Sequence, residues 1–140
     1  MSKVAPESDD EPQITLRWGA IAAGAALSYA LALAFGFGLA KAGLAGSVEW
    51  LPLAQFVALL AGGYLAGKWA GVSGFMNGVS VAVAFIVVWA VSNALYEARL
   101  VQENGPLALP TMNMGGIILG DFLNLSAAAF GGWLAERKGR

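Results

Sequence analysis

The sequence predicts an all-α membrane protein, because four long apolar stretches fill most of its 140 residues. Each stretch reaches the roughly 20 residues that a helix needs to cross about 30 Å of hydrocarbon. Only short segments separate the stretches, so the predicted fold is an integral membrane four-helix bundle with little mass outside the bilayer. The expected spans cover residues 18–40, 51–72, 75–96 and 112–134.

The composition agrees with this fold class and removes several kinds of chemistry. Hydrophobic residues make up 58% of the chain and charged residues 12%, which is about half the charged share of a soluble domain. The chain has no cysteine and no histidine, so it lacks thiolate chemistry and a histidine base. We expect no metal site and no cofactor, and a net charge of −1 does not indicate nucleic-acid binding.

The chain begins with a polar tail, residues 1–13, ahead of the first span. The tail is acidic, contains two prolines and has no apolar periodicity, so we expect it to be disordered unless it orders on a basic partner. Its acidity and the length of the apolar run that follows argue against a cleaved signal peptide. In the first span Ala20, Gly24 and Ser28 recur at four-residue spacing, which would let a second helix approach closely.

The second span carries the clearest stripe of small residues. Gly63, Gly67 and Gly71 recur every four residues, so we expect them on one helix face that packs against another helix. In the fourth span Gly116 and Gly120 repeat this spacing. All five are predicted helix-packing residues, either within the chain or against another protein.

The third span, 75–96, is followed by the largest segment expected outside the membrane. Residues 104–106 read Asn-Gly-Pro, which is a turn signal. We expect residues 97–103 to form a short, separate interfacial helix before that turn.

The fourth span contains the one acidic residue found inside an expected span. Asp121 lies about 14 Å into the span at 1.5 Å per residue, where an aspartate costs about 2.5–3.5 kcal/mol on insertion scales. We expect it to face the bundle interior. Helical spacing places Asn124 on the same face, and the first span offers polar groups at matching depth. The predicted intramembrane polar site is Asp121, Asn124, Tyr29 and Ser28.

Asp121 has two interpretations. As a structural residue, its carboxyl would be hydrogen-bonded to a neighbour such as Ser28, Tyr29 or Trp89 and would tie helices together. As a functional residue, it would couple transport to protons or cations. We favour the structural interpretation, because the expected spans contain no second acid, no histidine and no central cation to complete a relay.

Lys and Arg predict the orientation. Six of the eight would share one side with both termini, including the basic C-terminus, residues 137–140. The positive-inside rule therefore predicts cytoplasmic termini. Residues 62–68 read GGYLAGK and residues 131–137 read GGWLAER. This similarity indicates either two duplicated helical hairpins or the shared needs of two spans that exit toward the cytoplasm. Residues 14–136 form a single expected domain.

Several segments together resemble a family of small bacterial four-span membrane proteins of uncharacterised function. They are residues 17–20 (RWGA), residues 60–71 (LAGGYLAGKWAG) and residues 74–78 (GFMNG). The likeness covers about residues 13–95 and does not include Asp121. It implies a location in the bacterial cytoplasmic membrane, and the family supplies no catalytic residue to carry over.

The leading functional hypothesis is a non-enzymatic structural or accessory protein that packs against a larger membrane assembly or against itself. The alternative is a small oligomeric proton- or cation-coupled transporter that uses Asp121. The small multidrug resistance family has this size and span count, but its signature acid lies in the first span, which has none here. An enzyme is least expected, because the serines in the spans have no histidine or second acid to activate them.

Overall fold

The computed structural model describes residues 14–44, 50–109 and 111–139. Of these residues 87% are helical and none is in a strand, so the all-α prediction is confirmed. The long helices are α1 (Trp18–Lys41), α2 (Trp50–Ala70), α3 (Gly74–Asn104) and α4 (Met114–Lys138), with a 3-10 turn, η1 (Pro106–Ala108), between the last two. All four long helices are apolar enough to cross a membrane. The acidic tail, residues 1–13, lies outside the described residues.

Helix α3 differs from the expectation, because it continues unbroken through the segment expected to form a separate interfacial helix. Nothing between Tyr96 and Asn104 breaks a helix, and the first residue that does so is Gly105, whose φ is +82°. At 1.5 Å per residue, 31 residues extend about 46 Å, well beyond about 30 Å of hydrocarbon. Helix α4 begins two residues later than its expected span, because the Asn113 side chain caps it by accepting a hydrogen bond from the Gly116 N–H (3.1 Å).

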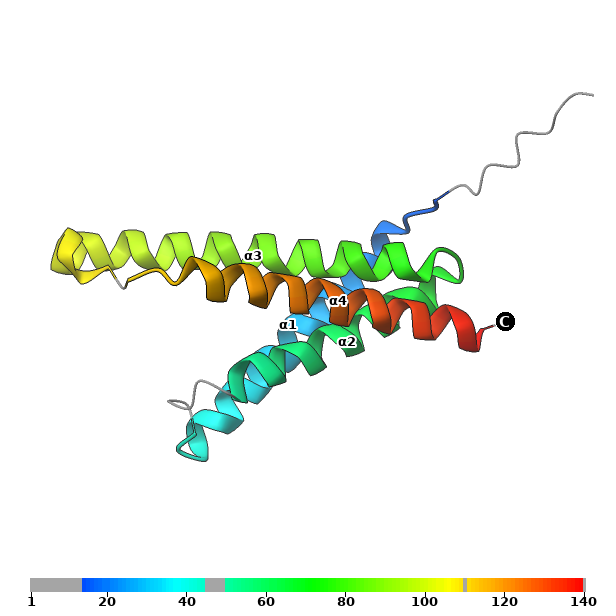
Figure 1. Ribbon diagram of the computed structural model, residues 1–140, viewed down its shortest axis with the longest axis horizontal. Helices are drawn as coiled ribbons and strands as arrows, with labels where there is room; N and C mark the ends of the chain where they lie inside the picture. The colour runs from blue at the N-terminus through cyan, green and yellow to red at the C-terminus, as the bar shows by residue number, and fades with distance from the viewer. Residues whose placement is uncertain (1–13, 45–49, 110, 140) are drawn as a thin grey trace, which may run out of the picture.

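The four helices form two arms that meet at one end of the molecule and diverge at the other (Figure 1). One arm is the antiparallel pair α1 and α2, and the other is the antiparallel pair α3 and α4. We call the end where the arms meet the closed end; it contains the α2–α3 turn, the start of α1 and the end of α4. The opposite end is the open end. Helices α2 and α3 each pack against all three other long helices, whereas the backbones of α1 and α4 do not approach each other within the described chain.

Direct backbone contacts hold the closed end together. A Cβ added at Gly63 of α2 would collide with the backbone of Ala128 in α4, and one added at Gly67 would lie 2.6 Å from the Gly132 carbonyl oxygen. Helix α3 packs on the same two α4 residues from the other side. A Cβ at Gly74 would collide with the Gly132 carbonyl, and a Cβ at Gly78 would collide with the Ala128 carbonyl. Helix α4 is therefore held between α2 and α3, with no room for one additional methyl group.

The α1–α2 contact is built in the same way. A Cβ at Gly24 would lie 2.5 Å from the Gly62 carbonyl oxygen, and a Cβ at Gly62 would collide with Ser28. Lipid provides no hydrophobic drive for helix association, so such close van der Waals contact is what stabilises each helix pair in the bilayer.

The glycines predicted to pack helices divide into two groups. Gly63 and Gly67 lie in helix contacts, as described above. Gly71 follows the end of α2 with a φ of +70° and has no atom near its Cβ position, so it serves the turn. Gly116 faces only the side chain of its own N-cap residue, and Gly120 faces nothing within 4 Å. These two lie where the arms have already diverged, so no helix is close enough to pack on them.

Asn77 fastens the α2–α3 turn to the start of α1. It is fully buried, and its side-chain oxygen accepts a hydrogen bond from the Arg17 N–H (2.9 Å). Its amide nitrogen donates to the carbonyls of Thr15 (3.1 Å) and Ser73 (3.0 Å). Across the turn, the Glu136 carboxylate of α4 accepts from the Gly74 N–H (2.9 Å). At the closed end, close backbone contacts and side-chain hydrogen bonds together link all four helices.

Gly67→Ala should destabilise the fold, because its new methyl group would meet the Gly132 backbone at 2.6–2.8 Å and overpacking costs about 1–3 kcal/mol. Gly120→Ala is the matched control, since its methyl group enters open space and the substitution should keep stability or raise it by up to about 1 kcal/mol through the higher helix propensity of alanine. Thermal unfolding in mild detergent measures both. Equal melting temperatures for Gly67→Ala and the unmodified protein would contradict the packing described.

Candidate intramembrane binding site

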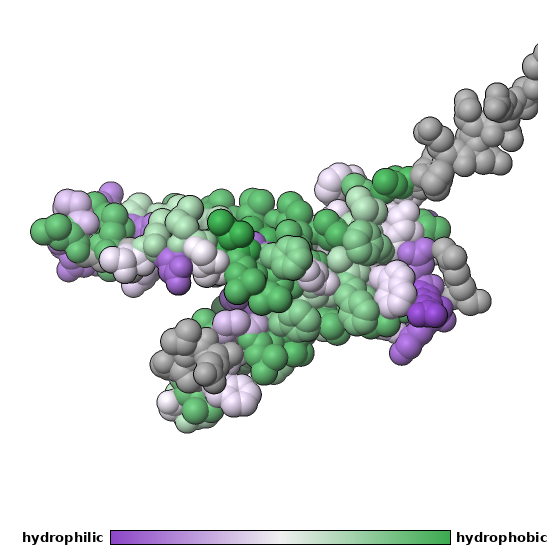
Figure 2. All heavy atoms as spheres, in the orientation of Figure 1, coloured by the Kyte–Doolittle hydropathy of each residue, from purple (hydrophilic) through white to green (hydrophobic). Residues whose placement is uncertain are grey.

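A cavity of about 380 Å³ lies on the open side of the point where the arms meet. Its wall comes from α2, α3, the start of α4 and the segment that precedes α4. The space-filling view shows the surface hollowed between the two arms (Figure 2). The lining residues are Pro52, Gln55, Phe85, Ile86, Trp89, Thr111, Met112, Asn113, Gly116, Ile117, Gly120, Asp121 and Asn124.

Helical spacing explains why one face of α4 dominates the wall. Asn113, Ile117 and Asp121 are four residues apart, and Asn124 follows three residues later, so all four share a face. Gly116 and Gly120 lie between them on this face and leave space in front of the backbone. The glycines that were expected to pack helices therefore widen the cavity.

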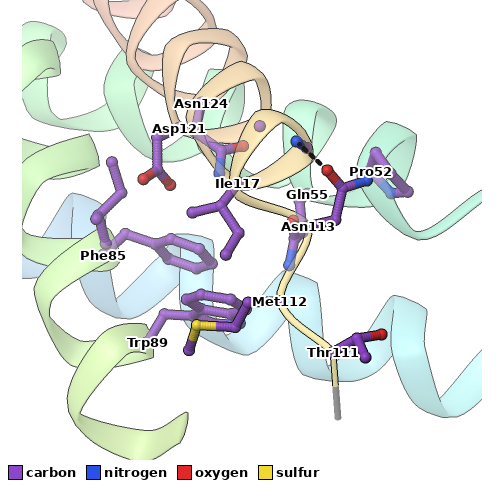
Figure 3. A pocket seen from close by; sticks show the side chains of 13 residues that line it. Pro52, Gln55, Phe85, Trp89, Thr111, Met112, Asn113, Ile117, Asp121 and Asn124 are labelled. Carbon is purple, nitrogen blue, oxygen red and sulfur yellow. Dashed lines mark hydrogen bonds between the residues drawn. The ribbon is translucent and has the colours of Figure 1, made fainter. Parts of the chain in front are cut away.

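The side chain of Asp121 is unpaired within the part of the chain that the structure describes. Across the described ranges, no hydrogen bond or ion pair reaches its carboxylate, and no buried side-chain oxygen or nitrogen lacks a partner. Since every buried polar side-chain atom has a partner and the Asp121 oxygens have none, these oxygens are not buried but exposed at the cavity wall. In the close-up, the carboxylate is directed from α4 toward the ring of Phe85, with Asn124 beside it (Figure 3).

The predicted hydrogen bond from Asp121 to Ser28, Tyr29 or Trp89 is wrong for the described chain. Ser28 and Tyr29 are on α1, whose backbone does not approach that of α4. Ser28 is fully buried and donates to the Gly24 carbonyl (3.0 Å), so it belongs to the α1–α2 contact. Trp89 lines the cavity but makes no hydrogen bond with Asp121.

Tyr29 lies behind the cavity wall. Its ring packs against the ring of Phe85, with centroids 5.1 Å apart at an interplanar angle of 51°, which is a favourable arrangement for an aromatic pair. Of the four residues predicted as a polar site, the structure brings together Asp121 and Asn124, and it leaves Ser28 and Tyr29 outside the cavity.

The structure adds two polar side chains that sequence reasoning missed, Gln55 and Thr111, and it places Asn113, which helical spacing puts on the Asp121 face, on the same wall. Gln55 is an uncharged polar residue in the otherwise apolar first half of α2, and its interruption of that run was the available signal. Asn113 is at the start of α4, and its side-chain oxygen is already used in capping the helix. Figure 3 shows Gln55 and Asn113 on the side of the cavity away from Phe85.

The arrangement offers one carboxylate, amide groups and aromatic rings on a mainly apolar wall. Within the described residues there is no group of three or more His, Cys, Asp or Glu side chains that could hold a metal ion. A single carboxylate in such a wall can bind a proton or a singly charged group.

Comparisons of the chain with protein-family models, with curated proteins and with solved structures gave no match.

Asp121→Leu should keep or raise the stability of the fold, because the carboxylate makes no hydrogen bond or ion pair within the described chain, so its removal leaves no buried partner unpaired. Asn77→Leu is the contrasting variant, since it removes the hydrogen bonds that hold the turn and should lower stability by at least 1–3 kcal/mol. Unfolding in detergent measures both. A loss of about 1–3 kcal/mol in Asp121→Leu would show that the carboxyl stabilises the bundle after all.

Proposed function

We propose that this multi-pass membrane protein is non-enzymatic and acts by association within the bilayer, either as a small accessory subunit of a larger membrane assembly or with a second copy of itself. The proposal rests on one observation, that the four helices pack closely at only one end of the bundle. The helices are in backbone contact at the closed end, but at the open end the arms separate and leave a cavity between them.

The polar groups in that cavity favour association. Asp121, Asn124 and Gln55 are costly at membrane depth when nothing pairs with them. A transmembrane segment that inserts between the arms would cover these groups and would supply the close contacts that hold helices together in lipid.

We further propose that the protein is in the bacterial cytoplasmic membrane with the closed end toward the cytoplasm. The closed end has Lys68, Arg137 and Lys138 at the ends of α2 and α4, and Arg17 at the start of α1. At the open end, the described cations are Lys41 and Arg99. This asymmetry supports cytoplasmic termini by the positive-inside rule, so that the cavity opens toward the outer leaflet.

A second candidate function is a small oligomeric transporter coupled to protons or cations. The specific observation in its favour is that the Asp121 carboxylate faces a cavity and has no internal partner within the described chain. An intramembrane carboxylate that is not used to hold helices together is available for a ligand or a proton.

The association proposal can be tested with single cysteines, because the natural chain has none. Ile117→Cys is on the cavity wall, and Ile118→Cys is the matched control one residue further along α4, at the same depth but outside the wall. With a short crosslinker that couples to the introduced thiol through one arm and to any nearby C–H bond through a photoactivated second arm, Ile117→Cys in intact bacterial membranes should give a discrete adduct and Ile118→Cys should give much less. The mass of the adduct separates a second copy from a different protein. No discrete adduct from Ile117→Cys, or equal adducts from both variants, would contradict association through the cavity.

A further inference from the structure

We infer that the cavity at the open end is a binding site for one lipophilic, singly charged organic cation, held between the Asp121 carboxylate and the rings of Phe85 and Trp89. The inference names a ligand class for the second candidate function above, and it rests on that function only for whether the bound cation is transported.

The charge of the cavity lining favours a cation. Asp121 is the only charged side chain among the cavity-lining residues, so the site has one formal negative charge and no cation to balance it. The basic residues of α1, α2 and α4 are in the last turns of those helices, and Arg99 is far along α3 beyond Trp89. A ligand with one positive charge would therefore balance the charge of the described lining.

The aromatic wall decides which kind of cation fits. Phe85 and Trp89 are one helical turn apart on α3, and both line the cavity. The Asp121 carboxylate is directed toward the Phe85 ring, and Trp89 lies further along the same wall (Figure 3). Aromatic faces attract cations, and tryptophan does so best. Tyr29 packs behind Phe85 with ring centroids 5.1 Å apart, which holds that ring in place.

The rest of the lining favours an organic cation over a metal ion. A divalent metal prefers several oxygen ligands, most of them carboxylates and waters, but the cavity has one carboxylate. Pro52, Ile86 and Ile117 give it apolar walls suited to hydrocarbon substituents. Its volume of about 380 Å³ falls within the roughly 300–1,000 Å³ of small-ligand pockets.

The test uses the full chain in lipid nanodiscs and the probe methyltriphenylphosphonium, with empty nanodiscs to correct for partition into lipid. Equilibrium dialysis should give saturable binding. Triphenylphosphine oxide, a neutral molecule of similar shape, should bind at least ten-fold more weakly. Asp121→Asn keeps the side-chain shape and should weaken binding of the cation at least ten-fold without changing binding of the neutral probe.

Trp89→Leu tests the aromatic wall and should weaken cation binding several-fold. Trp133→Leu is its matched control, because Trp133 is near the closed end and does not line the cavity. Unchanged cation binding in Asp121→Asn, or equal binding of the charged and neutral probes, would overturn the inference.

Transport is measured separately, by uptake of the same probe into proteoliposomes driven by a pH gradient. Saturable binding that depends on Asp121, without uptake, would support the site and would contradict the transporter function. Absence of binding in well-folded protein would reject the site, whereas the crosslinking experiment with Ile117→Cys would still decide on association.

Discussion

The contact between backbones in the closed end is the constraint on which the rest of the structure depends. Ala128 and Gly132 of α4 are pressed between Gly63 and Gly67 on one side and the start of α3 on the other. Because these contacts have no intervening side chains, they fix the distance and the crossing of three helices at one place. The Asn77 hydrogen bonds then attach the start of α1 to the same end.

The divergence of the arms follows from where those contacts stop. Beyond Gly63 and Ala128, larger side chains on α2 and α3 take the place of glycine, and the glycines of α4 in this region have no helix in front of them. Helices that touch only at one end and cross at an angle must separate toward the other. The cavity, with Asp121 on its wall, is thus a consequence of the uneven distribution of small residues along the chain.

Sequence reasoning could predict what depends on neighbours along one helix. The apolar length of each span, the packing face of Gly63 and Gly67, and the shared face of Asp121 and Asn124 all follow from helical periodicity. The four helices and their α-class were therefore predictable, and so was the position of Asp121 and Asn124 on one wall.

The other features of the fold and of the site depend on contacts between helices, and the periodicity of a single helix does not predict which helices are neighbours. Ser28 and Tyr29 have the right depth for Asp121, but α1 and α4 are not neighbours in the described chain. Gly120 has the spacing of a packing residue but meets no partner, because the arms have separated at its depth. Only the three-dimensional arrangement shows that Asp121 faces a cavity. This position favours a role for Asp121 in binding over a role in holding helices together.

The joining of the arms at one end and their separation at the other can be measured. Distances between pairs of spin labels in lipid nanodiscs test both directly, with one pair at Lys68 and Arg137 near the closed end and one at Leu51 and Met114 near the open end. The account predicts a clearly longer distance for the Leu51–Met114 pair. Similar distances for the two pairs, both compatible with the 8–10 Å spacing of packed helix axes, would contradict it.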